Sequence, residues 1–535
     1  MPRHRRGADS IALRPEIDEP QRPSVSRVVC TFLAVWVPML VWSFATPLNA
    51  APDEADHVRF AASVVRGADI EPVPRDDDDW DDQLATQLAL RGVTSDALLA
   101  EAWGTVTLPA FYGQDSFGCF AFQPNQTADC QVLDELPGDA SMVLASRFYP
   151  KSYYAIVGLP SLMTEGRIAV HGMRAVSAAL CAAFCTFAIL VALRRRPFHS
   201  VTVLGVLAAI TPMVWFLSGS VNPNAVEIAA ALATWVGLAT LLDDQAHIST
   251  LPARGVLAGT ALAGATVGVI RPISAFWLAV IAGIFALGTR RAQLGRLIGR
   301  RQVQVAIAAV AIVTGAQTLA TMANGSLSGV DPRTAQHALD GWAVLRTTIG
   351  RQGAMVEQLV GQLGWLDTPL PFAVLLGWYT IVGALVGLAL VHGDRRQLVG
   401  LGSLIAACFV VPVVLEAQAV NAVGFLWQGR YTLPMAVGVP VLAARAVGPA
   451  LLGTRRAGAL TVAVIAVTTG GSILALYTSL RRYAVGLSGP LAIWDDPSWN
   501  PPATVLVLLM AGVVAHAAAG WWFLRLARPV EAPPT

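Results

Sequence analysis

Apolar blocks of about 20 residues recur along the chain, and this repetition limits the possible folds more than any other feature. A helix of about 20 apolar residues crosses a hydrocarbon core roughly 30 Å thick. Only 13% of the residues are charged and 55% are hydrophobic, whereas a soluble protein carries about twice that charged fraction. The sequence therefore predicts an all-α polytopic membrane protein.

Twelve blocks are predicted to be transmembrane spans. They cover residues 28–48, 168–193, 199–218, 224–242, 255–271, 272–289, 303–323, 370–391, 397–416, 431–449, 458–479 and 503–525. An arginine-rich tail precedes the first span, and alternation through twelve spans places almost every later arginine cluster on the side of that tail. Since positive charge favours the cytoplasmic side, both termini are predicted to be cytoplasmic. The pair Arg481 and Arg482 is the exception.

The same topology places every long loop on the external side of the plasma membrane. We expect a cytoplasmic tail at 1–27, a transmembrane domain at 28–525 and a second cytoplasmic tail at 526–535. The predicted outer loops cover residues 49–167, 324–369, 417–430 and 480–502. The first span has full membrane length and a long polar region before it, so we expect it to be retained and not cleaved as a signal peptide.

The basic residues are dispersed along the chain, and nearly all of them are arginine. The net charge is +2 and no basic patch is present in the sequence, so we expect no nucleic-acid partner. Lys151 is the one lysine among 37 basic residues. This bias, together with abundant Ala, Gly and Val, indicates a GC-rich genome such as that of an actinobacterium.

Two features of the first outer loop suggest cross-linking or ion binding. Cys119 and Cys130 lie about ten residues apart outside the membrane, where a disulfide would close a small stabilising loop. A metal site is the alternative, but no second Cys or His pair lies nearby at ligand spacing. Residues 76–82 are almost all aspartate, which fits either a calcium site or a solvated acidic turn. The metal requirement stays open, with a divalent cation as the candidate cofactor.

The motif PDEADH, residues 52–57, follows directly after the first predicted span. Proline followed by two acids suits the first turn of a helix, where carboxylates interact favourably with the helix dipole. The same residues would also suit the reactive end of an enzyme, with Asp53 or Glu54 as a base. At helical spacing His57 shares a face with Asp53 and could be its partner; Asp56 is a further polar candidate.

Three more polar groups are predicted at the same aqueous boundary. Arg271 ends its span, and it either extends to the lipid headgroups or holds a lipid phosphate. Trp427, Gln428 and Arg430 precede a late span in the stretch FLWQGRYTLP. An aromatic belt would explain the tryptophan but not the glutamine and arginine together.

The third group is SGSVNPNAVEI, residues 218–228, and a separate stretch of the first outer loop is SRFYPKSYYAIVGLPSLM, residues 146–163. In the first, Asn224 fits a helix N-cap, whereas Asn222 and Glu227 have no evident structural purpose. The second fits an interfacial or re-entrant helix with Tyr153 and Tyr154 at headgroup level, or simple membrane-interface anchoring. Convergence of these groups with PDEADH on one boundary is the main functional signal in the sequence.

These motifs together resemble the GT-C superfamily of membrane glycosyltransferases. The resemblance rests on PDEADH after the first span, YPKSYY before the second, SGSVNPN after the third and WQGRY before a late span. Within that group the layout is similar to an uncharacterised bacterial multi-spanning family. The chain departs from many GT-C enzymes because it ends about ten residues after its last span and has a longer first loop.

The resemblance implies transfer of a sugar from a polyprenyl-phosphate donor to a glycan or glycolipid acceptor of the cell envelope. It assigns the catalytic carboxylate to Asp53, with Glu54 as the alternative. The expected substrate-binding residues are Asp56, His57, Tyr153, Tyr154, Asn222, Glu227, Arg271, Trp427, Gln428 and Arg430. Other membrane lipids are expected partners as well. The competing hypotheses are a transporter or flippase for a lipid-linked glycan, which would need polar groups at mid-membrane depth, and a non-catalytic envelope scaffold.

Overall fold

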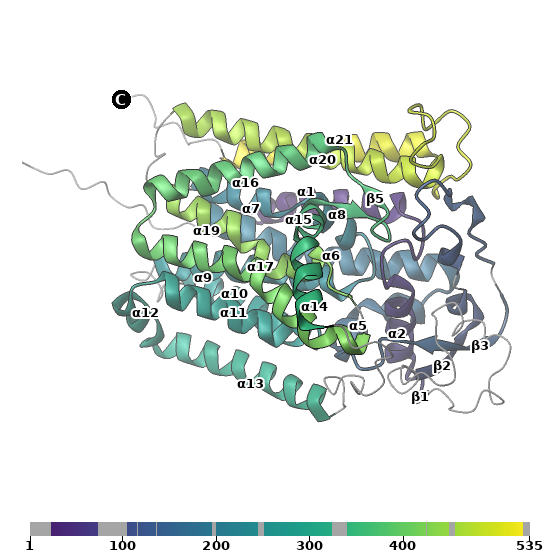
Figure 1. Cartoon of the computed structure of the whole chain (residues 1–535), viewed down its shortest axis with the longest axis horizontal. Coiled ribbons are helices and arrows are strands. Elements are labelled where there is room, and N and C mark those ends of the chain that lie inside the picture. Colours follow the sequence, from purple (N-terminus) through teal and green to yellow (C-terminus); the bar gives the residue numbers. More distant parts are fainter. Residues whose placement is uncertain are drawn as a thin grey trace, which may run out of the picture.

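The computed structural model describes residues 23–72, 104–114, 116–134, 136–194, 199–243, 251–323, 340–423, 425–448 and 455–527. These residues form an elongated helical bundle with a smaller region of strands and loops at one end (Figure 1). The predicted all-α polytopic architecture is confirmed for the bundle. The acidic stretch 76–82 lies outside the described residues, as do both predicted cytoplasmic tails apart from their residues nearest the membrane.

Every predicted span corresponds to a helix or to a pair of short helices. Within the described ranges, eight helices are by themselves long and apolar enough to cross a membrane. These are α1 (Val25–Ala45), α6 (Gly166–Leu193), α9 (Pro223–Asp243), α13 (Arg301–Ala323), α16 (Phe372–His392), α17 (Arg395–Val423), α20 (Arg455–Ala484) and α21 (Val505–Ala527).

The other four predicted spans are built from shorter helices. One consists of α7 (His199–Ala209) and α8 (Pro212–Ser218), which meet at a bend of 60°. Two more are α10 (Leu251–Val269) and α11 (Ser274–Gly288), which pack against each other after a tight reversal. The last consists of α18 (Gly429–Ala436) followed by α19 (Gly438–Val447).

The centre of the bundle is α9, and its edge is α13. The most apolar window of α9 is 94% buried, whereas that of α13 is only 6% buried although it is equally apolar. An apolar helix that exposes most of its side chains is suited to a lipid environment and not to water. The helix α9 packs between α6 and α10 and thereby holds the bundle together.

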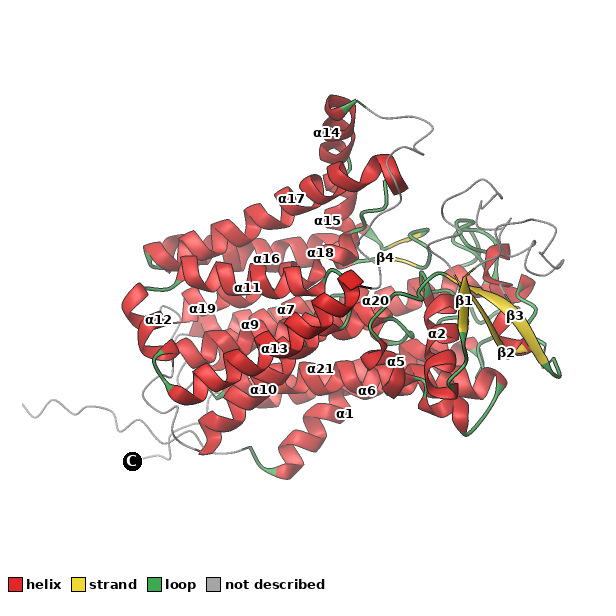
Figure 2. Ribbon diagram, turned by 90° about the horizontal axis from the view of Figure 1, so that it is seen from below, coloured by secondary structure: helices red, strands yellow, loops and turns green. Residues whose placement is uncertain are grey.

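One end of the bundle, here called the loop end, carries most of the non-spanning structure. It contains α2 (Glu54–Arg66), α5 (Lys151–Val157) and a three-stranded antiparallel sheet of β1 (Ile70–Pro72), β2 (Gly104–Pro109) and β3 (Asp139–Leu144). Figure 2 shows the sheet beside α2, beyond the ends of the spanning helices. The sequence-based prediction missed this sheet because its strands are short and lie within a polar loop. The helix α12 (Arg291–Ile298) lies at the opposite end of the bundle (Figure 1).

The four long loops predicted to share one side of the membrane do meet at the loop end. The segment before α16 carries α14 (Gly341–Gly350), α15 (Gln352–Val360) and a small ladder of β4 (Gln362–Leu363) and β5 (Thr368–Pro369). Trp365 Nε1 in this segment donates to the Asn49 carbonyl at 3.3 Å, and Leu487 N in the last loop donates to the Pro124 carbonyl at 3.0 Å. The predicted disulfide between Cys119 and Cys130 is confirmed.

Arg482, which does not follow the preference of positive charge for the cytoplasmic side, has a structural role at the loop end. Its side chain is fully buried, and Nη2 donates to the Phe120 carbonyl at 2.7 Å and to Asp367 Oδ2 at 3.0 Å. The residue therefore joins α20 to the first loop and to the segment before α16. A buried and paired arginine does not report on membrane orientation as a solvated arginine does.

Candidate functional site

Asp53 occupies a strained turn between α1 and α2. Its backbone is left-handed, with φ 66° and ψ 1°, and its side chain makes no capping hydrogen bond to α2. This conformation costs about 1–2 kcal/mol for most L-residues, although Asp and Asn tolerate it best. The sequence placed Asp53 in the first helical turn, but α2 begins at Glu54 and Asp53 precedes it. The carboxylate is therefore directed away from the helix it precedes.

Arg430 in the first turn of α18 is the partner of Asp53. Arg430 Nη2 lies 2.7 Å from Asp53 Oδ2 and 3.1 Å from the hydroxyl of Tyr431. The guanidinium side chain is only 2% exposed, whereas the Asp53 side chain is 49% exposed. A buried cation thus supports a carboxylate that remains accessible from outside the protein.

The electrostatic surroundings keep Asp53 ionised. Partial burial alone would raise the pKa of this carboxyl, but the attraction of Arg430, with a smaller contribution from Arg271, lowers the pKa below the usual value of 3.8. Hydrogen bonding to the charged form of a carboxyl acts in the same direction. Asp53 is therefore a carboxylate throughout the neutral pH range.

Arg271, in the turn between α10 and α11, supplies a second cation. Its Nη1 lies 3.0 Å from Glu227 Oε2, and its side chain is 10% exposed. Glu227, fully buried in α9, also accepts hydrogen bonds from the Ser274 hydroxyl and from Asn224 Nδ2. Burial in this network removes the option that Arg271 extends into the lipid headgroups. Burial by itself would lower the pKa of Arg271, but the attraction of Glu227 outweighs it and raises that pKa.

The ring of Tyr431 brings the two cations together. The guanidinium carbons of Arg271 and Arg430 each lie 5.0 Å from the centroid of this ring. Both distances are within the range of cation–π attraction. Two positively charged groups are thereby held next to the accessible carboxylate of Asp53.

Asn222, at the start of α9, connects these groups through further hydrogen bonds. Its Nδ2 donates to the Pro52 carbonyl at 3.2 Å, and the same carbonyl accepts from Arg430 Nη1 at 3.4 Å. Its Oδ1 accepts from the backbone N–H of Asn224 at 3.0 Å, so Asn222 and not Asn224 caps the helix. The polar groups that the topology placed at one boundary therefore form one hydrogen-bonded network.

Glu54 has a different environment from Asp53. It is fully buried and pairs with Arg174 of α6 through two contacts, Nε to Oε1 at 2.7 Å and Nη2 to Oε2 at 2.5 Å. The backbone N–H groups of Asn49 and Val221 also donate to it, at 3.0 and 2.9 Å. Of the two candidate carboxylates, Asp53 is the accessible one and Glu54 anchors the turn.

His57 lies behind Asp53 and bonds to Tyr154. The hydrogen bond joins His57 Nδ1 and the Tyr154 hydroxyl at 2.9 Å, so the expected side-chain partnership with Asp53 is replaced by this contact. Burial lowers the pKa of His57 to about 3, with Arg271 and Arg430 acting in the same direction and Asp53 opposing them. His57 is therefore neutral near pH 7.

Three further predicted site residues take part in packing contacts. Tyr153 and Tyr154 are buried within the protein, and Tyr153 hydrogen-bonds to the Ser177 hydroxyl at 3.0 Å. Asp56 lies 3.6 Å from Arg59 on the same helix. These residues therefore contribute to the packing around the turn that carries Asp53.

Trp427 and Gln428, which precede Gly429 and Arg430 in the chain, complete the site. Trp427 Nε1 donates to the Thr432 hydroxyl at 3.1 Å, and its ring packs edge-on against that of Tyr431. Gln428 Oε1 and Arg430 Nε are buried atoms for which the described residues supply no hydrogen-bond partner. Such buried polar atoms usually find a partner, and Arg430 Nε belongs to the guanidinium that contacts Asp53.

Sequence reasoning missed two arginines that position this network. Arg174 donates to the carbonyls of Ser43, Thr46 and Pro47 as well as to Glu54. Arg351, from the segment before α16, lies 2.8 Å from the buried carboxylate of Glu416. An arginine within an apolar span is the signal that would have identified Arg174, since a charge at that depth needs a partner.

No metal centre is evident at this site. Within the residues that the structure describes, no group of three or more His, Cys, Asp or Glu side chains is arranged to hold a metal ion. Arg430 balances the charge of Asp53 in this arrangement.

Comparison with known proteins places the chain in a family. No curated protein matches it in sequence. Its structure is similar, at 15% identity and a TM-score of 0.34, to the crystal structure of ArnT from Cupriavidus metallidurans bound to undecaprenyl phosphate; the match covers 71% of this chain and about two thirds (66%) of that one. A family model described as "Predicted membrane protein (DUF2142)" matches residues 37–439. The chain therefore belongs to the DUF2142 family of membrane proteins.

Proposed function

We propose that this protein is a glycosyltransferase that moves a sugar from a polyprenyl-phosphate donor to a hydroxyl of a cell-envelope glycan or glycolipid. The observation that carries the proposal is the accessible Asp53 carboxylate held by a buried arginine, with a second buried arginine beside it. A carboxylate next to two cations suits transfer from a sugar phosphate, because the carboxylate can accept a proton and the cations can stabilise the leaving phosphate. The likeness of the PDEADH and WQGRY motifs to GT-C enzymes supports the same conclusion.

In the proposed reaction Asp53 is the general base. It accepts the proton of the acceptor hydroxyl while the hydroxyl oxygen forms a bond to the anomeric carbon. The bond between that carbon and the phosphate oxygen breaks, and the electron pair leaves with the lipid phosphate. Arg430 and Arg271 stabilise the negative charge on the leaving phosphate, because guanidinium groups bind phosphate oxygens in a bidentate manner.

Arg430 couples donor binding to the strength of the base. In the free protein its attraction keeps the pKa of Asp53 low, and a carboxyl with a low pKa is a weak base. A donor phosphate that shares Arg430 would weaken this ion pair and raise the basicity of Asp53. The site would then become reactive when the donor is present.

Glu54 and Arg174 position the base in this proposal and do not take part in the chemistry. The proposed reaction takes place at the loop end, on the external face of the plasma membrane. The loops 49–167, 324–369, 417–430 and 480–502 form the external part of one transmembrane domain, 28–525, and both termini are cytoplasmic. A donor anchored in the outer leaflet would reach Asp53 from the membrane, and the acceptor would approach from the aqueous side.

The test is sugar transfer by the purified protein in nanodiscs, with a radiolabelled polyprenyl-phosphate sugar. Asp53→Asn should reduce the transfer rate by about a hundredfold or more, since general-base catalysis contributes about 10²–10⁴-fold. The matched control is Asp243→Asn, which also removes an aspartate paired with an arginine, Arg445, in a different part of the bundle. Undiminished transfer by the Asp53 variant would rule out this base. Translocation of a lipid-linked glycan in liposomes, without a new glycosidic bond, would favour a transporter instead.

A further inference from the structure

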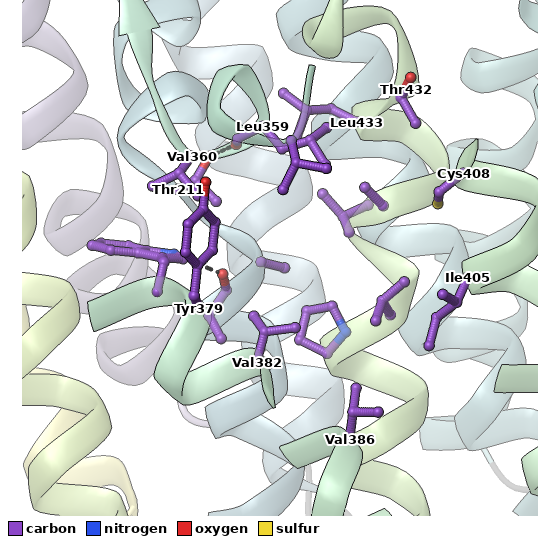
Figure 3. A pocket seen from close by; sticks show the side chains of 18 of the residues that line it. Thr211, Leu359, Val360, Tyr379, Val382, Val386, Ile405, Cys408, Thr432 and Leu433 are labelled. Atoms are coloured by element: carbon purple, nitrogen blue, oxygen red, sulfur yellow. Dashed lines mark hydrogen bonds between the residues drawn. The ribbon is translucent and has the colours of Figure 1, made fainter. Parts of the chain in front are cut away.

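An apolar pocket of about 310 Å³ lies between α16 and α17. Figure 3 shows Tyr379 and Val382 of α16 on one wall and Ile405 and Cys408 of α17 on the other. Leu359 of α15 and Leu433 of α18 lie at one end of the view, and Val386 lies at the other end (Figure 3). The pocket therefore extends along spanning helices, starting beneath the loop end.

Three of the polar side chains around this pocket already have partners. The Thr211 hydroxyl donates to the Leu359 carbonyl at 2.8 Å, and Trp378 Nε1 donates to the Ala208 carbonyl at 3.1 Å. The Thr432 hydroxyl accepts from Trp427 Nε1. With these groups satisfied and the other lining residues mostly aliphatic, the pocket suits a hydrocarbon occupant.

The position of the pocket indicates where that hydrocarbon comes from. Helices α16 and α17 are consecutive in the chain and both pack against α19, but α16 otherwise packs against α20 whereas α17 packs against α11 and α14. Their divergence leaves space at the depth of the bilayer, where lipid chains are the available hydrocarbon. A chain can therefore enter the pocket sideways from the membrane.

Helix α18 links this pocket to the proposed site. Arg430 in its first turn binds Asp53, while Thr432, Leu433 and Ala436 of the same helix line the pocket. One helical turn rises only about 5.4 Å. A single lipid can therefore place its phosphate at Arg430 and its chain in the pocket.

We propose that this pocket holds the prenyl chain of a polyprenyl phosphate whose phosphate group lies at Arg430. The choice of a prenyl chain over a phospholipid acyl chain rests on the proposed function, because the pocket continues the site that would bind that donor. The proposal adds where the chain enters, between α16 and α17, and which residues contact it.

Two glycines of α16 provide a matched pair of variants. A Cβ added at Gly383 or at Gly387 would meet no atom within 4 Å, so a larger side chain can begin at either position without a clash at its Cβ. Only Gly383 lines the pocket. Gly383→Leu should fill the space that the chain occupies, and Gly387→Leu makes the same change one turn away. Ala436→Leu fills the pocket from α18. It provides an independent test if Gly383→Leu does not fold.

The experiment measures photo-crosslinking of a diazirine-bearing polyprenyl phosphate to the protein in nanodiscs, with adducts located by mass spectrometry. We expect adducts on α16 and α17 and competition by unlabelled polyprenyl phosphate. Gly383→Leu and Ala436→Leu should each lower the apparent affinity roughly tenfold or more, because leucine displaces buried methylene groups of the chain. Gly387→Leu should leave it unchanged.

Two results would overturn the proposal. One is equal crosslinking of the wild type and both filling variants. The other is labelling of the pocket by a diazirine phosphatidylglycerol that polyprenyl phosphate does not displace, which would assign the pocket to bilayer phospholipid. Binding is measured without sugar transfer, so retained crosslinking in a protein that transfers no sugar would count against the proposed function and not against the pocket.

Discussion

The guanidinium of Arg430 lies 2.7 Å from the carboxylate of Asp53 although 377 positions separate the two residues in the chain. One residue follows the first span, and the other begins the helix pair that forms a late span. Their contact joins the early and late halves of the bundle at the loop end. It also places the accessible carboxylate beside a cation that is already desolvated, so the protein bears the cost of burying that charge before any substrate binds.

The first prediction concerns the strength of this contact. In a double-mutant cycle of Asp53→Asn and Arg430→Gln, the coupling free energy should be about 1 kcal/mol, because the half-exposed carboxylate is partly screened by solvent. The cycle is measured by thermal unfolding in detergent. A coupling near zero would mean that the pair does not contribute to the stability of the free protein.

The pair between Arg271 and Glu227 should matter more for stability. Glu227→Gln removes the partner of a buried cation, which typically costs about 3–5 kcal/mol. The comparison is Asp243→Asn, which removes the partner of Arg445; the Asp243 side chain is 25% exposed whereas that of Glu227 is fully buried, so this loss should be the smaller one. Chemical denaturation of the two variants would give the difference. Similar losses in both variants would contradict the buried network described for Arg271.

The left-handed backbone at Asp53 predicts an unusual order of stability among its variants. Asp53→Gly and Asp53→Ala both remove the ion pair, but only glycine adopts a φ of 66° without strain. Asp53→Gly should therefore be the more stable by about 1 kcal/mol. Melting temperatures measured side by side would test this. Alanine equal to or better than glycine would show that the turn relaxes when the carboxylate is removed.

His57 should make the protein less stable as the pH falls. Its pKa is lowered from 6.5 to about 3 in the folded protein, so the unfolded chain binds a proton that the folded protein excludes. Stability is complete above pH 6.5 and declines as the pH falls towards 3. Between pH 8 and pH 5.5 the loss due to this residue is roughly 1.4 kcal/mol. The measurement is the stability of the wild type relative to His57→Gln at both pH values; a constant difference would contradict the prediction.

The hydropathy pattern and the distribution of arginines were sufficient to predict the helical bundle. All twelve predicted spans coincide with helices, including the reversal at Arg271 and the bent pair α7 and α8. These features follow from local composition, because each span must be apolar over a length set by the bilayer. The alternation of the predicted spans also placed PDEADH, Asn222, Arg271 and Arg430 on the same side of the membrane, and in the structure these residues are joined in one network of contacts. The three-stranded sheet was not predicted, because short strands in a polar loop carry little periodic signal.

By itself, then, the sequence determined the class of fold, the alternation of the spans and the end of the bundle at which the polar residues gather. Only the tertiary structure decided between two adjacent carboxylates. Asp53 and Glu54 are adjacent and both carry a carboxylate, so the local sequence does not distinguish them. Glu54 is enclosed by Arg174 and two backbone N–H groups. Asp53 lies in a left-handed turn and pairs with Arg430 while remaining half-exposed. Their difference depends on partners far away in the chain, and such partners are chosen by packing and not by local pattern.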